Sequence, residues 1–242
     1  MEKRNVKRGG EKHLRALLVG PDREVIEEKM LMDTPESGTA GGIQRVRLAT
    51  TVLRKGIYGL NVTVSGDRYG TQIAWGFGTN CPQYLIETSR GHRDARHEEP
   101  LILLSPDRSG DVCFMPREGE FSVGVKGLAA GVETLVMYDG GGKQVGEVQV
   151  DEKGGGSGRF SDGVRSVTTP WRLHFPKYEG VVQIDGLTRW AKGDVFSNLS
   201  LWTPNAESWF AFRENRWLLT PYSRTVYAES GAGGEVTFQV HN

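Results

Sequence analysis

The chain has 242 residues, and its 30 lysines and arginines balance 30 aspartates and glutamates, so its formal net charge at pH 7 is zero. A chain without net charge has no net electrostatic field to attract polyanions from a distance, which argues against nucleic acid as its main partner. No stretch reaches the roughly 20 apolar residues that a membrane-spanning helix needs, so we expect no membrane span.

Short segments in which apolar residues alternate with polar or small ones recur along the chain. The period of two is typical of β-strands with one buried face. Residues 24–32 could form a helix, but Val25 and Ile26 follow a Pro-Asp turn and favour a strand. Many of the 33 glycines lie between such segments, as turn residues do. The clearest alternating segments are residues 46–50, 60–64, 121–125 and 236–240.

The chain also repeats itself. Residues 103–106 (Leu-Leu-Ser-Pro) return 115 positions later as residues 218–221 (Leu-Leu-Thr-Pro), and residues 120–123 return at the same offset as residues 235–238. Upstream, residues 17–22 resemble residues 135–139, and residues 56–62 resemble residues 169–175. We therefore expect an all-β chain of two tandem antiparallel β-sandwich modules, jelly-roll-like and related by internal duplication. The expected modules are residues 1–118, with a charged insertion at 89–100, and the aromatic-rich residues 119–242.

The turn and strand motifs in each copy resemble the prepeptidase C-terminal-like and carbohydrate-binding jelly-roll modules of secreted bacterial hydrolases. This resemblance implies a fold and a secreted, substrate-targeting role, with a catalytic domain of the same precursor as partner. The setting that it implies is extracellular or the cell envelope. The residues that carry the resemblance are 18–22 with 56–60 in the first copy, and 136–140 with 171–173 in the second.

The charged insertion is the densest group of titratable residues in the chain. One interpretation is a solvated loop. A second is an enzyme, a lyase or hydrolase acting on polysaccharide, because lyase chemistry needs a cation for a uronate and a His or Tyr to move a proton. A third is a metal site with N, O, N ligands from His92, Asp94 and His97. The candidate catalytic residues, to none of which the sequence commits, are His92, Arg93, His97 and Tyr84.

The two cysteines, Cys81 and Cys113, bracket this insertion. A bridge between them would pin both ends of the insertion and would indicate an oxidising compartment. The alternative is a pair of reduced thiols in the core, since free cysteine is among the most buried residue types. The sequence leaves both alternatives open, with Cys81–Cys113 as the candidate disulfide.

Aromatic residues concentrate in the second copy, where four of the six tryptophans fall between residues 190 and 217. Exposed rings on a β-sandwich can stack on sugar rings while polar neighbours bind the hydroxyls, although such rings can equally belong to the core. We expect a non-catalytic polysaccharide-binding module, with an enzyme or a structural spacer as alternatives. The predicted ligand-binding residues are Trp202, Asn205, Glu207, Trp209, Arg213 and Trp217.

No cofactor is expected. A structural Ca²⁺ could be held at loop edges, where carboxylates are common in sandwich modules. The aspartates at such edges are Asp67, Asp139, Asp151, Asp162, Asp185 and Asp194.

Overall fold

The computed structural model describes residues 1–5, 13–32, 43–64, 73–88, 98–162, 168–190, 200–212 and 223–239. In these ranges the fold is all-β with antiparallel sheets, so the predicted class is confirmed. The helical element that the described residues contain is one turn of 3-10 helix, η1 (Ala206–Ser208). Within the same ranges, no helix has the length and apolar character needed to cross a bilayer.

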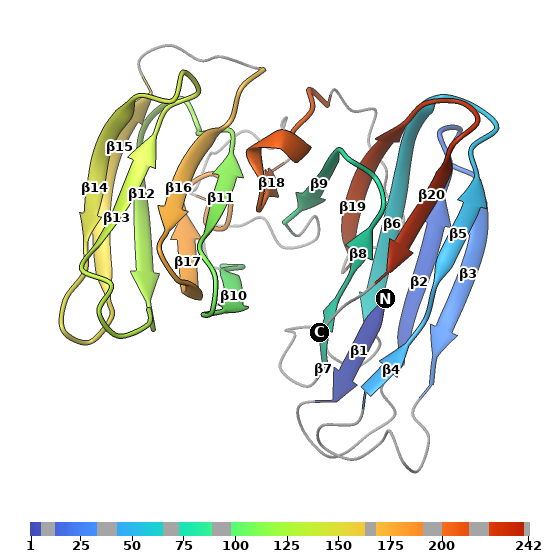
Figure 1. The fold of residues 1–242 in the computed structure, drawn as a ribbon, viewed down its shortest axis with the longest axis horizontal. Helices are drawn as coiled ribbons and strands as arrows, with labels where there is room; N and C mark the ends of the chain where they lie inside the picture. The colour runs from blue at the N-terminus through green and yellow to red at the C-terminus, as the bar shows by residue number, and fades with distance from the viewer. Residues whose placement is uncertain are drawn as a thin grey trace. The chain divides into compact units, whose positions relative to one another are not determined.

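The chain forms two compact units. Unit 1 consists of residues Met1–Tyr84 and Asn215–Asn242, and unit 2 of Leu85–Glu214. In Figure 1 unit 1 accordingly contains both blue strands from the start of the chain and red strands from its end. The expected boundary between residues 118 and 119 falls inside unit 2.

Unit 2 is a β-sandwich. One sheet has the strand order β10-β17-β12-β15, and the other has the order β14-β13-β16-β11-β18-β9. Strands β10 to β17 alone give the two four-stranded sheets of a jelly roll. The strand bounds are β9 (Tyr84–Glu87), β10 (Leu101–Ser105), β11 (Gly110–Phe114), β12 (Gly119–Lys126), β13 (Thr134–Tyr138), β14 (Gln144–Gln149), β15 (Gly156–Asp162), β16 (Trp171–Phe175), β17 (Tyr178–Ile184) and β18 (Leu201–Thr203).

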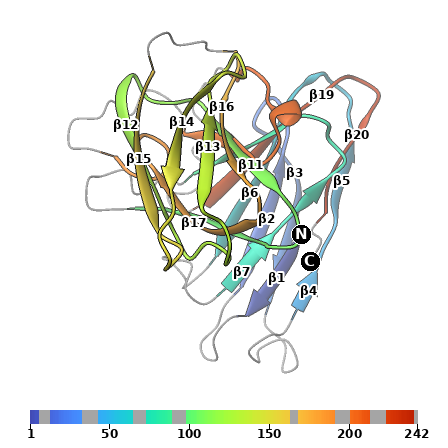
Figure 2. The same cartoon turned by 60° about the vertical axis from the view of Figure 1, so that its left-hand side comes forward.

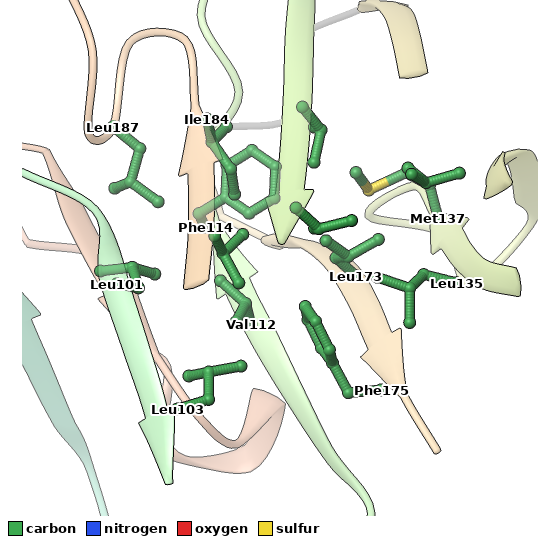
Figure 3. Packing of buried hydrophobic residues seen from close by; sticks show 14 of the residues in the cluster. Leu101, Leu103, Val112, Phe114, Leu135, Met137, Leu173, Phe175, Ile184 and Leu187 are labelled. Atoms are coloured by element: carbon green, nitrogen blue, oxygen red, sulfur yellow. The ribbon is translucent and has the colours of Figure 1, made fainter. Parts of the chain in front are cut away.

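The core of unit 2 lies between its two sheets, where alternate residues of each strand meet (Figure 3). At its centre is Phe121 of β12, which is 1% exposed. Its ring lies 6.0 Å from that of Phe114, 5.7 Å from that of Phe160 and 5.5 Å from that of Trp171. Because these rings come from both sheets, they hold the two layers of the sandwich together.

Unit 1 contains the strands β19, β6, β2 and β3, hydrogen-bonded in that order, and two three-stranded sheets, β4-β1-β7 and β5-β20-β8. Figure 2 shows β4, β1 and β7 side by side. The predicted strand at residues 25–26 lies in β3. The strand bounds are β1 (Glu2–Asn5), β2 (Leu14–Val19), β3 (Val25–Leu31), β4 (Ile43–Arg45), β5 (Leu48–Thr51), β6 (Gly56–Val64), β7 (Ile73–Gly76), β8 (Gly78–Thr79), β19 (Ser223–Ser230) and β20 (Glu235–Gln239).

The two short sheets of unit 1 continue each other, because β20 and β1 lie end to end. Phe238 of β20 is opposite Leu48, and Glu2 of β1 is opposite Arg45. Between them the amino group of Met1 donates to the carbonyl of Val46. Gln239 and Met1 therefore occupy successive positions along one continuous line of strand, here called the strand line. In this line β20, from the end of the sequence, is followed by β1, from its start.

Candidate functional site

The charged insertion falls mainly outside the described residues. This applies to His92, Arg93, Asp94 and His97, and therefore to the predicted metal ligands and to three of the four catalytic candidates. The fourth, Tyr84, is half-buried and packs its ring edge-on against Phe77 at a centroid distance of 5.9 Å. In the described ranges no group of three or more potential metal ligands comes together.

The predicted aromatic platform does not form a shared exposed surface among its described residues. Trp202 packs against the core of unit 2, and Trp209 is only 9% exposed. Asn205 caps the 3-10 helix, with its side-chain oxygen accepting the N–H of Glu207, which is itself exposed. Arg213 and Trp217 lie outside the described residues. The two described tryptophans thus have the packing of core residues.

The predicted disulfide is wrong, because both cysteines are free and buried. Cys81 follows β8 in unit 1, whereas Cys113 lies in β11 of unit 2. Burial raises the pKa of the Cys81 thiol. Burial, with a smaller effect of the Asp111 carboxylate, raises the pKa of Cys113 to about 12. Without a bridge, the cysteines do not indicate an oxidising compartment.

We expect two thiols per chain to react with a thiol reagent in guanidinium chloride without reductant, and the folded protein to react far more slowly. Raised pKa values leave little of the nucleophilic thiolate near neutral pH, and burial blocks access to both sulfur atoms. The measurement is a colorimetric thiol count on folded and unfolded protein. A count near zero in the unfolded protein would restore the bridge.

The aspartates considered for Ca²⁺ have other partners where the structure describes them. Asp139 and Asp151 accept backbone N–H groups of their own turns, and Asp185 accepts the N–H of Ser122 and pairs with Arg189. Asp67 and Asp194 lie outside the described residues, as does the side chain of Asp162. The three described carboxylates therefore stabilise local structure.

The structure brings together four polar residues that the sequence does not single out: Asp111, Tyr138, Arg172 and His174, here called the Asp111 cluster. They lie on three adjacent strands, β11, β16 and β13. His174 Nδ1 is 2.7 Å from Asp111 Oδ1, and an Arg172 nitrogen is 3.4 Å from Asp111 Oδ2. The guanidinium carbon of Arg172 lies 4.3 Å from the centre of the Tyr138 ring.

Alternation along β16 explains why the cluster faces outward. Trp171, Leu173 and Phe175 point into the core, so Arg172 and His174 point to the other face of the sheet. In the ladder, Arg172 is opposite Tyr138 on one side, while His174 is opposite Asp111 on the other. The side chains of Asp111, Arg172 and His174 are 20%, 35% and 36% exposed, which leaves them open to a ligand.

Unit 1 has different residues at the corresponding place. Its strand β6 lies between β2 and β19, as β16 lies between β13 and β11. The repeat matches Gly59 with Arg172 and Asn61 with His174. Asn61 is opposite Thr225 and donates to its hydroxyl at 3.1 Å, and both residues are buried. Unit 1 thus has a buried amide and hydroxyl on β6 and its neighbour β19, whereas unit 2 has a partly exposed imidazole and carboxylate on β16 and its neighbour β11.

No family model matches the sequence, and no curated protein matches it. Among solved structures, the VP2 subviral particle of infectious bursal disease virus is 10% identical over 98% of this chain and 62% of that chain, with a TM-score of 0.14. The structure of the Gt strain of the same virus is 10% identical over 98% of this chain and 64% of that chain, with a TM-score of 0.12. The chain thus spans less than two thirds of both, and TM-scores this low do not establish a shared fold.

Proposed function

We propose that this protein is a non-catalytic polysaccharide-binding module and that the Asp111 cluster of unit 2 is its binding site. Sugar hydroxyls both donate and accept hydrogen bonds, so they suit a carboxylate beside a guanidinium and an imidazole. The cluster presents these groups, partly exposed, on a rigid sheet. The observation that carries the proposal is that unit 1 lacks the charged groups at the corresponding place.

The comparison of the units rests on an internal duplication, which we also propose. Three features of the structure support it besides strand order. The first strand of each hairpin has a register irregularity near its end, between Leu18 and Val19 in β2 and between Met137 and Tyr138 in β13. The turns that follow, residues 20–24 and 139–143, are closed by the same two backbone hydrogen bonds. Arg23 and Gly142 hold the same left-handed place in these turns, with φ of 69° and 81°.

If the chain arose by this duplication, the C-terminal strands of each sequence copy pair with the other copy. Strands β10 to β12 follow the first copy along the chain but pair within unit 2, with β15, β16 and β17. The matching C-terminal strands β19 and β20 instead pair with β6 and with β5 and β8 of unit 1. Each unit then has one copy of the same strand arrangement. Unit 1 forms this strand arrangement without charged residues on β6, so the fold does not require the charged residues of the Asp111 cluster. They are therefore available to bind a ligand.

We expect the double substitution Asp111→Thr with His174→Asn to remove binding while leaving the fold intact, since it installs the pair that unit 1 contains. Loss of even one hydrogen bond to a charged group, worth about 1.5–3 kcal/mol, should raise Kd by about 10–100-fold. The measurement is glycan-array binding followed by titration calorimetry on any glycan bound, with melting temperature as the check on folding.

Lys126→Gln, a charge change on the exposed end of β12, is the matched control and should bind as the native protein does. Binding that survives the double substitution, or absence of any glycan ligand across a broad array, would contradict the proposal. In the setting implied by the family resemblance, the module would hold a catalytic domain of the same precursor near its polysaccharide, outside the cell or in its envelope.

A further inference from the structure

The guanidinium of Arg172 is only partly used within the protein. Its contact with Asp111 joins one nitrogen to one oxygen at 3.4 Å, because the other carboxylate oxygen is taken by His174 at 2.7 Å. The pair Arg15–Glu28 in unit 1 makes two such bonds, of 2.6 and 3.2 Å. Arg172 thus retains donors that an ordinary bidentate pair would occupy.

The other carboxylates near the cluster already have partners. On the same sheet, Glu147 of β14 accepts from the side-chain amides of Gln144 and Gln149. Asp139, which follows Tyr138 in the chain, accepts the backbone N–H groups of Gly141 and Lys143. Among the described residues, Asp111 is therefore the carboxylate that Arg172 contacts.

Tyr138 is not an open stacking surface on the side that Arg172 covers. The guanidinium lies over the ring at 4.3 Å, and this cation–π contact fixes its position on the sheet. A neutral sugar that binds mainly by stacking would have to displace it. The Arg172 side chain is 35% exposed, so a planar or tetrahedral anion can instead bind guanidinium nitrogens that Asp111 does not contact, without breaking the contact with the ring.

We infer that the polysaccharide bound by the Asp111 cluster carries an anionic group, a carboxylate or a sulfate, and that Arg172 binds this group. The inference rests on the proposed function and names its ligand class. His174 contacts Asp111 through Nδ1, so its Nε2 takes no part in that contact, and because the side chain is 36% exposed Nε2 can bind a neighbouring oxygen of the same sugar. Asp111 then positions both side chains.

The test is calorimetric titration of the full chain with three soluble polymers: polygalacturonate, dextran sulfate and unmodified dextran. We expect at least one polyanion to bind with a Kd at least tenfold below that for dextran, and the stronger of the two identifies a carboxylate or a sulfate. Arg172→Gln should weaken polyanion binding by about 10–100-fold. Arg172→Lys, which keeps the charge but loses the planar fork, should recover only part of the affinity.

Arg159→Gln is the matched control, because it removes one exposed arginine from β15, in the other sheet of unit 2. An equal loss in this control would mean nonspecific attraction and would overturn the inference. Equal binding of dextran and the polyanions, weakened equally by Arg172→Gln, would overturn the anionic ligand while supporting the proposed function. Absence of binding to all three polymers and to the glycan array would overturn both.

Discussion

Residues 85–214 produced alone will unfold in one cooperative thermal transition, whereas residues 119–242 will show none. The first fragment contains both sheets of unit 2 and the whole aromatic and aliphatic core between them. The second lacks β10 and β11, which supply Leu101, Leu103, Val112 and Phe114 to that core. It also carries β19 and β20 without their partners β6 and β5. Circular dichroism melts and the dispersion of amide NMR signals measure the difference.

The corresponding fragment of unit 1 needs a rearranged chain. Residues 215–239 followed directly by residues 1–84 would join Gln239 to Met1, which already take successive places on one strand line. We expect this chain to contain antiparallel sheet and to melt cooperatively. A cooperative transition in residues 119–242, or its absence in residues 85–214, would show that the units do not fold along the division seen in the structure.

Phe121→Ala should lower the free energy of unfolding of unit 2 by about 3–5 kcal/mol, the usual cost of removing a fully buried ring. Phe121 is 1% exposed, and its ring contacts three other aromatic rings drawn from both sheets. The cavity left behind cannot close without moving both layers. Urea unfolding of residues 85–214, followed by tryptophan fluorescence, measures the change.

Ile102→Ala is the control for this experiment. Ile102 lies on the outer side of β10 and is 64% exposed, so its truncation should change stability by no more than about 0.5 kcal/mol. Similar losses for the two substitutions would contradict the assignment of Phe121 to the centre of the core.

Local pattern predicted the strands well, because alternation depends only on neighbouring residues. Residues 60–64 lie in β6 and residues 121–125 in β12, as the period of two indicates. The partners of these strands could not be predicted in the same way. The repeat shows that residues 103–106 and 218–221 are alike, but two equivalent segments can each complete either sheet. The division into units depends on which sheet each segment joins. Pairing between strands that are distant in the sequence decides this.

The candidate site was missed for a related reason. Its residues lie at positions 111, 138, 172 and 174, and no local motif connects them. The aligned repeat nevertheless contains a difference at two of these positions, because Gly59 aligns with Arg172 and Asn61 aligns with His174. The charged insertion and the tryptophans are more conspicuous in the sequence than these two single-residue differences.

Strands β19 and β20 of unit 1 come last in the sequence, so they also determine the order in which the two units can fold during synthesis. Unit 2 is complete once residue 214 has left the exit tunnel, and domains generally fold as they emerge. Strand β6, made much earlier, must wait for β19 before its second edge is covered. The nascent chain therefore carries an open sheet edge from the synthesis of β6 until β19 has been made, and this edge is where chaperones would be expected to act.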